Sequence, residues 1–271
     1  MSRDSRVVAR PRVGALGLLA AVVAAATLAP GSRARASATE PAAPGQTGAP
    51  AKPWCGPDVT ELEDHVCFAD GGAAPSGRRT LVVYLHGMLA ATPGFQYVQQ
   101  RMMARQATSL RFTLLMPTSP RTDAGYWWPS GAAQKEGEPD IVAGILRERG
   151  ELEARLGARF DETFVVGFSS GAYYASSLAL RGALPIDGYV VLAGGSSWMR
   201  PAASTPRVPV FVGVSGSDRQ TAEHSRAFAG TLAALRWPYR VEERSVGHEV
   251  DAVFLAHGLG WLRSRARGEG R

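Results

Sequence analysis

The sequence predicts an α/β fold, with a mostly parallel, doubly wound sheet and helices on both faces of the sheet. Two observations predict this fold class. From residue 80 onward, short β-rich runs alternate with segments of helical periodicity, and most of the runs are continuously apolar, as strands covered on both faces must be. The repeated order of strand, helix and strand favours parallel strands joined by right-handed crossovers.

Six β-rich runs are the expected strands of this sheet. They span Leu81–Leu85, Phe112–Met116, Phe164–Phe168, Tyr189–Leu192, Val208–Val214 and Tyr239–Ser245. Helices are expected between them, where apolar residues recur at helical spacing. The residues that set this spacing are Phe95, Val98 and Met102, then Ile141, Ile145, Leu152 and Leu156, then Phe228, Leu232 and Leu235, and finally Val250, Val253, Phe254 and Trp261.

Residues 1–38 have the layout of a secretory signal peptide. Four arginines precede the apolar run Val13–Pro30, and the small residues Ala36-Ser37-Ala38 follow it. We expect cleavage before Thr39 and a secreted protein, extracellular or periplasmic. The run is about as long as a short membrane span, so an uncleaved anchor is the alternative. Cleavage is favoured because the run is mostly Ala and Gly rather than Leu and Ile.

Residues 39–53, with the sequence TEPAAPGQTGAPAKP, are predicted to be a disordered linker, because they have almost nothing to bury. Residues 54–271 are then expected to form one domain. The formal net charge of the chain is +6, of which residues 1–38, with six Arg and one Asp, contribute +5. The domain is therefore nearly neutral, which excludes a nucleic-acid-binding protein, since that function requires a basic face on the working domain.

The chain has two cysteines, Cys55 and Cys67. In an exported protein, a disulfide between them is the simplest expectation, and it would pin the N-terminal edge of the domain. A free pair in a reducing compartment is the alternative. Two thiols with only His65 nearby are too few ligands for a zinc site, so we expect no metal.

The stretch Gly167-Phe168-Ser169-Ser170-Gly171 lies where an expected strand ends and the helical stretch Ala172–Leu180 begins. The pattern Gly-x-Ser-x-Gly is weak alone, but a tight turn from strand to helix strains its central residue, and small residues two positions away relieve the crowding. This places Ser169 at the turn, because Ser170 at the apex would put the bulky Phe168 in a flanking position. A serine that only caps the helix is the alternative.

A serine hydroxyl needs a base to take its proton and an acid to orient that base. Asp218 follows the expected strand that ends at Val214, and His248 follows the one that ends at Ser245. Carboxyl ends of parallel strands are where chemistry lies in such sheets. We therefore expect Asp218 and His248 to serve Ser169, with a helix N-cap as the alternative role of Asp218.

His86 ends the first expected strand and precedes Gly87 and Met88. Backbone N–H groups there can point at a developing oxyanion, so the amides of Met88 and Ser170 are the predicted oxyanion hole. The side chain of His86 is expected to be a structural hydrogen bonder. The other histidines are expected to be satisfied or solvent-facing, with His65 before the sheet and His224 and His257 within helices.

Together these motifs resemble the α/β-hydrolase superfamily. The matching pieces are Tyr84-Leu85-His86-Gly87, Gly167-Phe168-Ser169-Ser170-Gly171, Gly216-Ser217-Asp218 and Gly247-His248. The resemblance covers residues from about Thr80 to Leu262 and implies the α/β-hydrolase fold. Within the superfamily, the short domain and the leader resemble small secreted carboxylesterases and polyester-depolymerase-type esterases. Met88 and Leu89 stand where lipases of the superfamily carry glycines after the histidine.

The segment Thr122–Pro139 is expected to be a long loop that leaves a strand's carboxyl end and joins a helix beginning near Asp140. It is rich in aromatic residues, and loops of this length are often functional. Trp127 and Trp128 are predicted to wall the acyl or alcohol pocket, unless one of them only roofs the core. Weaker candidates for the rim are Ser196, Ser197 and Trp198.

These observations predict a secreted serine hydrolase that cleaves carboxylic esters through an acyl-enzyme. The expected substrate is a small-molecule or polymeric ester, with no cofactor, no nucleic-acid partner and no stable membrane association after cleavage of the signal. A serine peptidase or amidase with the same residues is one alternative, although such peptidases usually carry a gating domain. An inactive binding protein of the same fold is the other.

Overall fold

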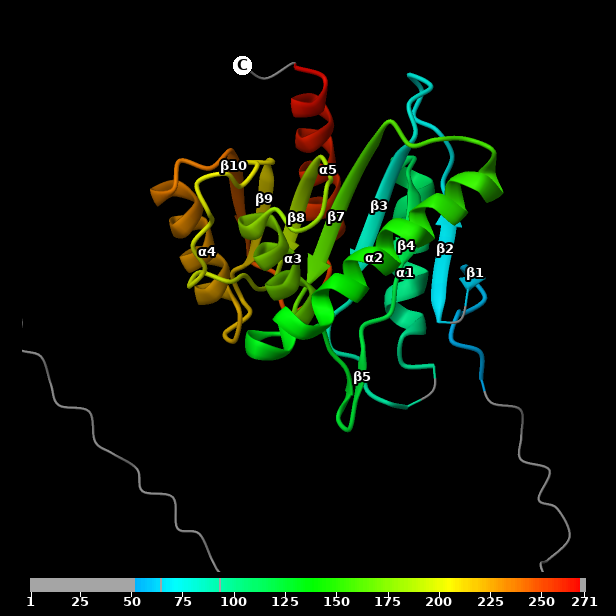
Figure 1. Ribbon diagram of the computed structural model, residues 1–271, viewed down its shortest axis with the longest axis horizontal. Helices are drawn as coiled ribbons and strands as arrows, with labels where there is room; N and C mark the ends of the chain where they lie inside the picture. Colours follow the sequence, from blue (N-terminus) through cyan, green and yellow to red (C-terminus); the bar gives the residue numbers. More distant parts are fainter. Residues whose placement is uncertain (1–51, 64, 93, 269–271) are drawn as a thin grey trace, which may run out of the picture. The chain divides into compact units, whose positions relative to one another are not determined.

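An eight-stranded sheet lies at the centre of the computed structural model, which describes residues 52–63, 65–92 and 94–268 (Figure 1). Its strands are β1 (Thr60–Glu63), β2 (Val66–Asp70), β3 (Thr80–Leu85), β4 (Thr113–Met116), β7 (Glu162–Phe168), β8 (Gly188–Leu192), β9 (Val210–Ser215) and β10 (Tyr239–Arg244). The strand order is β1-β2-β4-β3-β7-β8-β9-β10, and each neighbouring pair from β4 to β10 is parallel. The prediction of a mostly parallel sheet is confirmed.

All six predicted strands are present, with shifts of one or two residues at their ends. The largest shifts are of two residues, at β7, which begins at Glu162 rather than Phe164, and at β9, which begins at Val210 rather than Val208. The strands β3, β4, β7, β8 and β9 are buried along their whole length, which is why their sequences are mostly apolar. At the edge of the sheet, β10 is largely exposed and correspondingly more polar.

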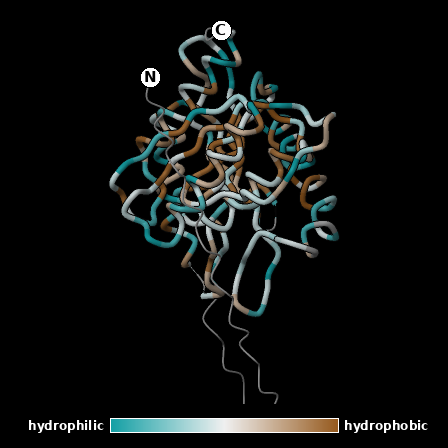
Figure 2. Tube along the Cα trace, turned by 90° about the vertical axis from the view of Figure 1, so that its left-hand side faces the viewer, coloured by the Kyte–Doolittle hydropathy of each residue, from teal (hydrophilic) through white to brown (hydrophobic). Residues whose placement is uncertain are grey.

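Helices cover both faces of the sheet (Figure 1). They are α1 (Tyr97–Leu110), α2 (Gly131–Leu156), α3 (Ser170–Arg181), α4 (Ala222–Ala234) and α5 (Ala252–Ala266). One hydrophobic cluster joins α2, α3 and α4 to the sheet, and a second joins α1 and α5 to it. Hydrophobic segments run between these layers, and the outer loops are mostly hydrophilic (Figure 2). The fold is therefore doubly wound.

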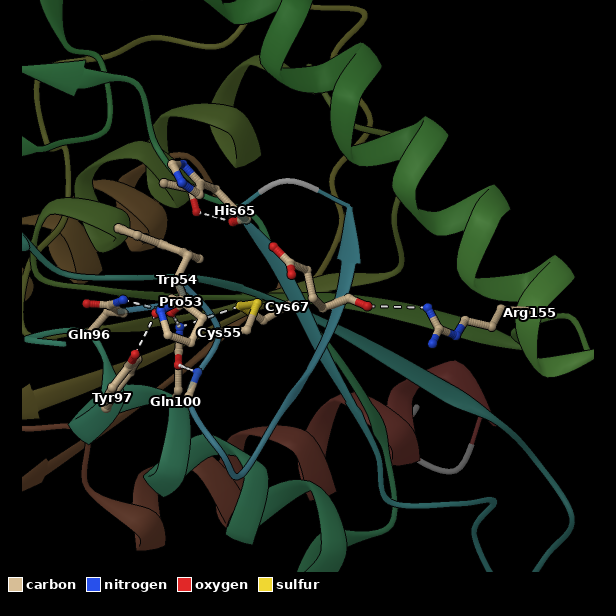
Figure 3. Close-up of a disulfide and its surroundings, with 12 residues drawn as sticks. Pro53, Trp54, Cys55, His65, Cys67, Gln96, Tyr97, Gln100 and Arg155 are labelled. Atoms are coloured by element: carbon tan, nitrogen blue, oxygen red, sulfur yellow. Dashed lines mark hydrogen bonds between the residues drawn. A yellow bond between two sulfur atoms is a disulfide. The ribbon is translucent and has the colours of Figure 1, made fainter. Parts of the chain in front are cut away.

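The predicted apolar face of α1 is wrong at Phe95 and Val98, whereas Met102 is partly buried and packs against the core as expected. Phe95, before the helix, and Val98, within it, are 53% and 77% exposed, and the buried residues include Gln100 and Met103. The segment of residues 53–56, here called the N-terminal segment, packs on this face of α1 and explains the difference. Gln100 donates to the carbonyl of Trp54 at 3.1 Å and accepts from the Gly56 amide at 2.7 Å (Figure 3). A buried polar face is stable when its hydrogen bonds are satisfied in this way.

The expected loop Thr122–Pro139 is also wrong in its second half, because α2 begins at Gly131 and contains Pro139. A proline inside a helix removes a backbone hydrogen bond and usually ends the helix. Here contacts with α3 hold the early turns: Gln134 donates to Ser177 Oγ at 2.8 Å, and Glu138 forms an ion pair with Arg181. The first half of the expected loop contains a short ribbon of β5 (Arg121–Thr122) and β6 (Gly125–Tyr126).

An antiparallel hairpin, β1 and β2, extends the sheet on the N-terminal side and was not predicted. His65 lies in its turn with a positive φ of 62°, and not before the sheet as expected. The ring of His65 packs 5.0 Å from the ring of Trp54. The short polar strand β1 is an edge strand, so its sequence lacks the apolar run that marks the central strands.

The expected disulfide between Cys55 and Cys67 is present (Figure 3). Cys67 lies on β2 and is fully buried, and Cys55 belongs to the segment that docks on α1. Tyr97 of α1 donates to the carbonyl of Pro53 at 2.5 Å, next to the docked segment. The disulfide therefore fixes the N-terminal segment across α1 and the edge of the sheet.

Replacing both cysteines by alanine is expected to lower the free energy of unfolding by about 3 kcal/mol. Without the crosslink, the unfolded chain gains conformational entropy, and for a loop of this length the gain corresponds to about that free energy. The two residues are 12 positions apart. For a domain of this size, the loss corresponds to a melting temperature lower by about 6–12 °C. Thermal unfolding followed by circular dichroism checks this, and equal melting temperatures for the oxidised protein and the double variant would contradict it.

The predicted signal peptide, residues 1–38, and residues 39–51 of the predicted linker lie outside the described residues. No helix in the part of the chain that the structure describes is long and apolar enough to cross a membrane.

Candidate active site

The turn between β7 and α3 places Ser169 in a strained conformation. Its φ is 52° and its ψ is −116°, in a region that residues with a side chain rarely adopt. A Cβ on Gly167 would lie 2.4 Å from the carbonyl oxygen of Gly171, and a Cβ on Gly171 would lie 2.0 Å from the carbonyl oxygen of Leu85. Both flanking glycines are thus required, and the turn is centred on Ser169, as predicted from the sequence.

The structure brings Ser169, Asp218 and His248 together at the carboxyl ends of three strands. Nε2 of His248 lies 2.9 Å from Oγ of Ser169, and Nδ1 of His248 lies 2.6 Å from Oδ2 of Asp218. The carboxylate of Asp218 can only accept, so in a neutral imidazole the proton lies on Nδ1 of His248 and points at Asp218. Nε2 is then free to accept a hydrogen bond from the serine hydroxyl. The arrangement can therefore move a proton off Ser169.

Asp218 is 5% exposed and accepts hydrogen bonds at both carboxylate oxygens. Burial alone would raise its pKa, but hydrogen bonds from the Thr221 hydroxyl, from His248 and from the Gln220 amide outweigh burial and lower the pKa to about 2. The carboxylate also receives the Thr221 amide at 3.4 Å, at the start of α4. Asp218 thus contacts His248 and also holds the turn that precedes α4, whose N-cap is Thr221.

The lowered pKa of Asp218 predicts a loss of stability in acid. Its unfolded value is near 3.8 and its folded value about 2, so the stabilisation is complete above about pH 4 and disappears as pH falls toward 2. We expect Asp218→Asn to be less stable than the wild type at pH 6 by about 2 kcal/mol. The difference should shrink between pH 4 and pH 2 in urea unfolding at each pH, and a difference that stays constant would contradict the assignment.

His86 is buried and has fixed partners on both ring nitrogens. Nδ1 lies 2.6 Å from the carbonyl oxygen of Gly87, and Nε2 lies 3.1 Å from the amide nitrogen of Ser119. The carbonyl requires a donor and the amide requires an acceptor, so His86 is neutral with its proton on Nδ1. Burial lowers its pKa to about 4. The geometry therefore agrees with the expected structural role of this side chain.

The predicted oxyanion donors lie between amides that are already engaged. The amide of Gly87 donates to Gln99, and the amide of Leu89 donates to the carbonyl of Tyr126 at 3.2 Å. The amide of Gly171 donates to the carbonyl of His86 at 3.1 Å. A Cβ on Gly87 would lie 3.3 Å from Cβ of Ser169, which places the residues before Met88 directly beside the serine.

The comparisons with known proteins concern the fold. No protein-family model and no curated protein sequence matches the chain. Solved structures do match, among them YahD with malic acid, at a TM-score of 0.52 and 14% identity over 73% of this chain and 98% of that one. A carboxylesterase from Mesorhizobium loti matches with a TM-score of 0.52 and 15% identity over 73% and 93% of the two chains. Arabidopsis thaliana SOBER1 matches with a TM-score of 0.53 and 17% identity over 69% and 99%.

The chain has the α/β-hydrolase fold. In this fold, the side chains of Ser169, Asp218 and His248 follow β7, β9 and β10 in the chain order that the sequence motifs predicted.

A pocket of about 500 Å³ opens beside Ser169. It is lined by Met88, Trp127, Trp128, Pro129, Ser130, Gly131, Gln134, Ser169, Ser170, Tyr173, Tyr174, Ser196 and Trp198. These side chains are uncharged and many are aromatic, and the volume lies in the range of small-ligand sites. The pocket can thus hold an uncharged, largely apolar group next to the serine hydroxyl.

The two tryptophans predicted to wall a pocket differ in their surroundings. Trp127 is 41% exposed, whereas Trp128 is 4% exposed and stacks on Tyr174 with ring centroids 5.4 Å apart. Both line the pocket, but Trp128 also belongs to the core cluster under α2 and α3. Ser196 and Trp198 line the same pocket, and Trp198 is 65% exposed at its rim.

Sequence reasoning missed Tyr173 and Tyr174, which reach the pocket from α3. Tyr173 follows Ser169 by one helical turn, and this spacing was the available signal, because residues four apart share a helix face. The hydroxyl of Tyr173 lies 2.5 Å from Nδ1 of His224, and Nδ1 of His257 lies 2.7 Å from Glu242. Both helical histidines therefore have partners. Within the described ranges, no group of three His, Cys, Asp or Glu side chains is placed to hold a metal ion.

Proposed function

We propose that the chain is a serine hydrolase that cleaves carboxylic ester bonds through an acyl-enzyme intermediate. Ser169 is the nucleophile, His248 is the general base and then the general acid, and Asp218 orients His248. The observation that carries the proposal is the continuous line of contacts from Ser169 Oγ through His248 to Asp218, at the mouth of an uncharged pocket.

Acylation begins when Oγ of Ser169 bonds to the ester carbonyl carbon while Nε2 of His248 takes the hydroxyl proton. The carbonyl oxygen gains negative charge, and the amides of Met88 and Ser170 are the proposed donors to it. As the bond to the alcohol oxygen breaks, His248 returns the proton to that oxygen. The alcohol leaves, and the acyl group stays on Ser169.

Deacylation repeats these steps with water. His248 takes a proton from the water as its oxygen bonds to the acyl carbon, and the same two amides receive the oxyanion. When the bond to Oγ breaks, His248 protonates Ser169 and the carboxylic acid is released. Asp218 keeps its negative charge throughout, and it stabilises the imidazolium in both halves of the reaction.

One observation favours esters of uncharged, apolar groups, and another agrees with ester chemistry in general. The pocket beside Ser169 is aromatic and uncharged, so a charged acyl or alcohol group would lose its hydration without compensation. The solved structure from Mesorhizobium loti is a carboxylesterase, which agrees with ester chemistry on this fold.

We also propose that the protein is exported. The disulfide between Cys55 and Cys67 supports this, because disulfides form and persist in oxidising compartments. Purifying the mature protein from a secreting host and sequencing its N-terminus tests the proposal, and a first residue at Thr39 is the expected result.

One set of assays tests the proposed reaction. A fluorophosphonate probe should label the protein at Ser169, and p-nitrophenyl esters of increasing acyl length should be hydrolysed faster than peptide anilides. Labelling without ester turnover, or anilide turnover above ester turnover, would favour a peptidase or amidase. An unlabelled, correctly folded protein would favour a binding protein that keeps the fold.

A further inference from the structure

We propose that the segment Gly125–Trp128, termed the clamp segment, holds the amides of Met88 and Ser170 in register with each other. The inference rests on the proposed function, because those amides are the proposed oxyanion donors. The two donors come from segments far apart in the sequence, after β3 and at the start of α3. Their relative position must be set by contacts between these segments, and the clamp segment contacts both.

The carbonyl oxygen of His86 is the first meeting point. It accepts the amide of Gly171 at 3.1 Å and the indole Nε1–H of Trp128 at 2.9 Å. The first bond ties the His86–Met88 segment to the start of α3. The second bond ties the same carbonyl to the clamp segment, so a shift of any one of the three segments breaks a buried hydrogen bond.

Trp128 also contacts the side chain of the residue that carries the second donor. Its backbone amide donates to Oγ of Ser170 at 3.2 Å. Trp128 is buried, and its ring is nearly parallel to that of Tyr174, with an angle of 11° between the planes. Trp128 therefore contacts the segment before Met88 through its indole and the residue that carries the second amide through its backbone.

Leu89 is held by the other end of the clamp segment. Leu89 and Tyr126 exchange both backbone hydrogen bonds, at 3.2 Å and 2.9 Å. Gly125 has a φ of 130°, and a Cβ there would lie 2.1 Å from the carbonyl oxygen of Leu89. The close approach of the two backbones requires glycine. Met88 is thus fixed on both sides, through His86 by Trp128 and through Leu89 by Tyr126.

This makes Trp128 a positioning residue for the reaction. An oxyanion donor acts only when its N–H points at the place where the charge develops, and a misplacement of about 1 Å can cost on the order of 100-fold in rate. The hydrogen bond from Nε1 of Trp128 is the part of the clamp that a conservative change can remove. Phenylalanine at this position keeps an aromatic ring against Tyr174 and loses the indole donor together with part of the buried ring, and the control variant below shares the loss of ring.

The test measures Trp128→Phe with matched oxoester and thionoester substrates, with rates normalised to the sites labelled by the fluorophosphonate probe. Thionoester sulfur accepts hydrogen bonds weakly, so its turnover depends less on the donors. We expect kcat for the oxoester to fall about 10- to 100-fold and KM to stay within about twofold. The ratio of oxoester to thionoester turnover should fall by a similar factor.

The matched control is Trp237→Phe. The indole of Trp237 donates to the carbonyl of Val208 at 2.8 Å and is 3% exposed, so the same kind of buried hydrogen bond is lost. Val208 precedes β9, at the end of the sheet opposite to Ser169. This variant should lose similar thermal stability, but its kcat per labelled site and its substrate ratio should match the wild type.

Ser170→Ala is measured in parallel, in case Trp128→Phe does not fold. It removes the acceptor of the Trp128 amide and keeps the amide of residue 170, and a fall in kcat of about 3- to 10-fold is expected. The proposal would be overturned if each of these two variants that folds had the wild-type kcat and the wild-type ratio of oxoester to thionoester turnover. A wild-type protein that is neither labelled nor active would overturn the proposed function, and the clamp with it.

Discussion

Replacing Ser169 by alanine is expected to lower kcat for ester hydrolysis by at least about 10⁴-fold, because the nucleophile of the proposed acyl-enzyme is removed and only binding and the oxyanion donors remain. Labelling by the fluorophosphonate probe should disappear. Alanine keeps the Cβ that the strained turn already accommodates, so the melting temperature should change little.

The control for this variant is Ser109→Ala. Ser109 is an exposed serine on α1, away from the pocket. It should keep wild-type kcat and labelling. Residual turnover above about 1% in Ser169→Ala, measured on protein free of contaminating esterase, would show that another group is the nucleophile.

Replacing Asp218 by asparagine is expected to lower kcat about 10⁴-fold, with KM nearly unchanged. Oδ2 of Asp218 accepts from Nδ1 of His248, whereas an amide nitrogen in that place donates to Nδ1. The imidazole proton then moves to Nε2, where it blocks transfer of the proton from Ser169. Steady-state kinetics with a p-nitrophenyl ester measure the effect.

Asp251→Asn is the matched control for this variant. Asp251 caps α5, where its side chain accepts from the Phe254 amide at 2.9 Å, and asparagine serves equally well as a cap. Its kcat should equal that of the wild type. If Asp218→Asn also keeps full activity, Asp218 acts only in holding the turn before α4, and another acid must orient His248.

The sequence was sufficient for the features that depend on local pattern. Continuous apolar runs predicted the central strands, because a strand buried on both faces carries mostly apolar side chains. The glycines around Ser169 predicted the turn, because their backbones approach neighbours too closely for a Cβ. Asp218 and His248 could be predicted because each directly follows a strand.

Predictions from local sequence pattern were wrong where contacts with distant segments decide which residues are buried or helical. The apolar residues Phe95 and Val98 suggested the inner face of α1, but the docked N-terminal segment pairs with polar residues of that helix. The helix was expected to begin near Asp140, but the contacts of Gln134 and Glu138 with α3 hold helical turns before it. Neither partner lies near these residues in the sequence.

For this protein, the sequence by itself determined the alternation of strands and helices, the strained turn at Ser169 and the order of the three side chains that meet there. Only the tertiary structure decided that Trp128 is buried while Trp127 borders the pocket, and that Trp128 and Tyr126 hold the residues around Met88. The reason is physical: periodicity and steric demand are properties of neighbouring residues, whereas burial and hydrogen-bond partners depend on segments that meet only after folding.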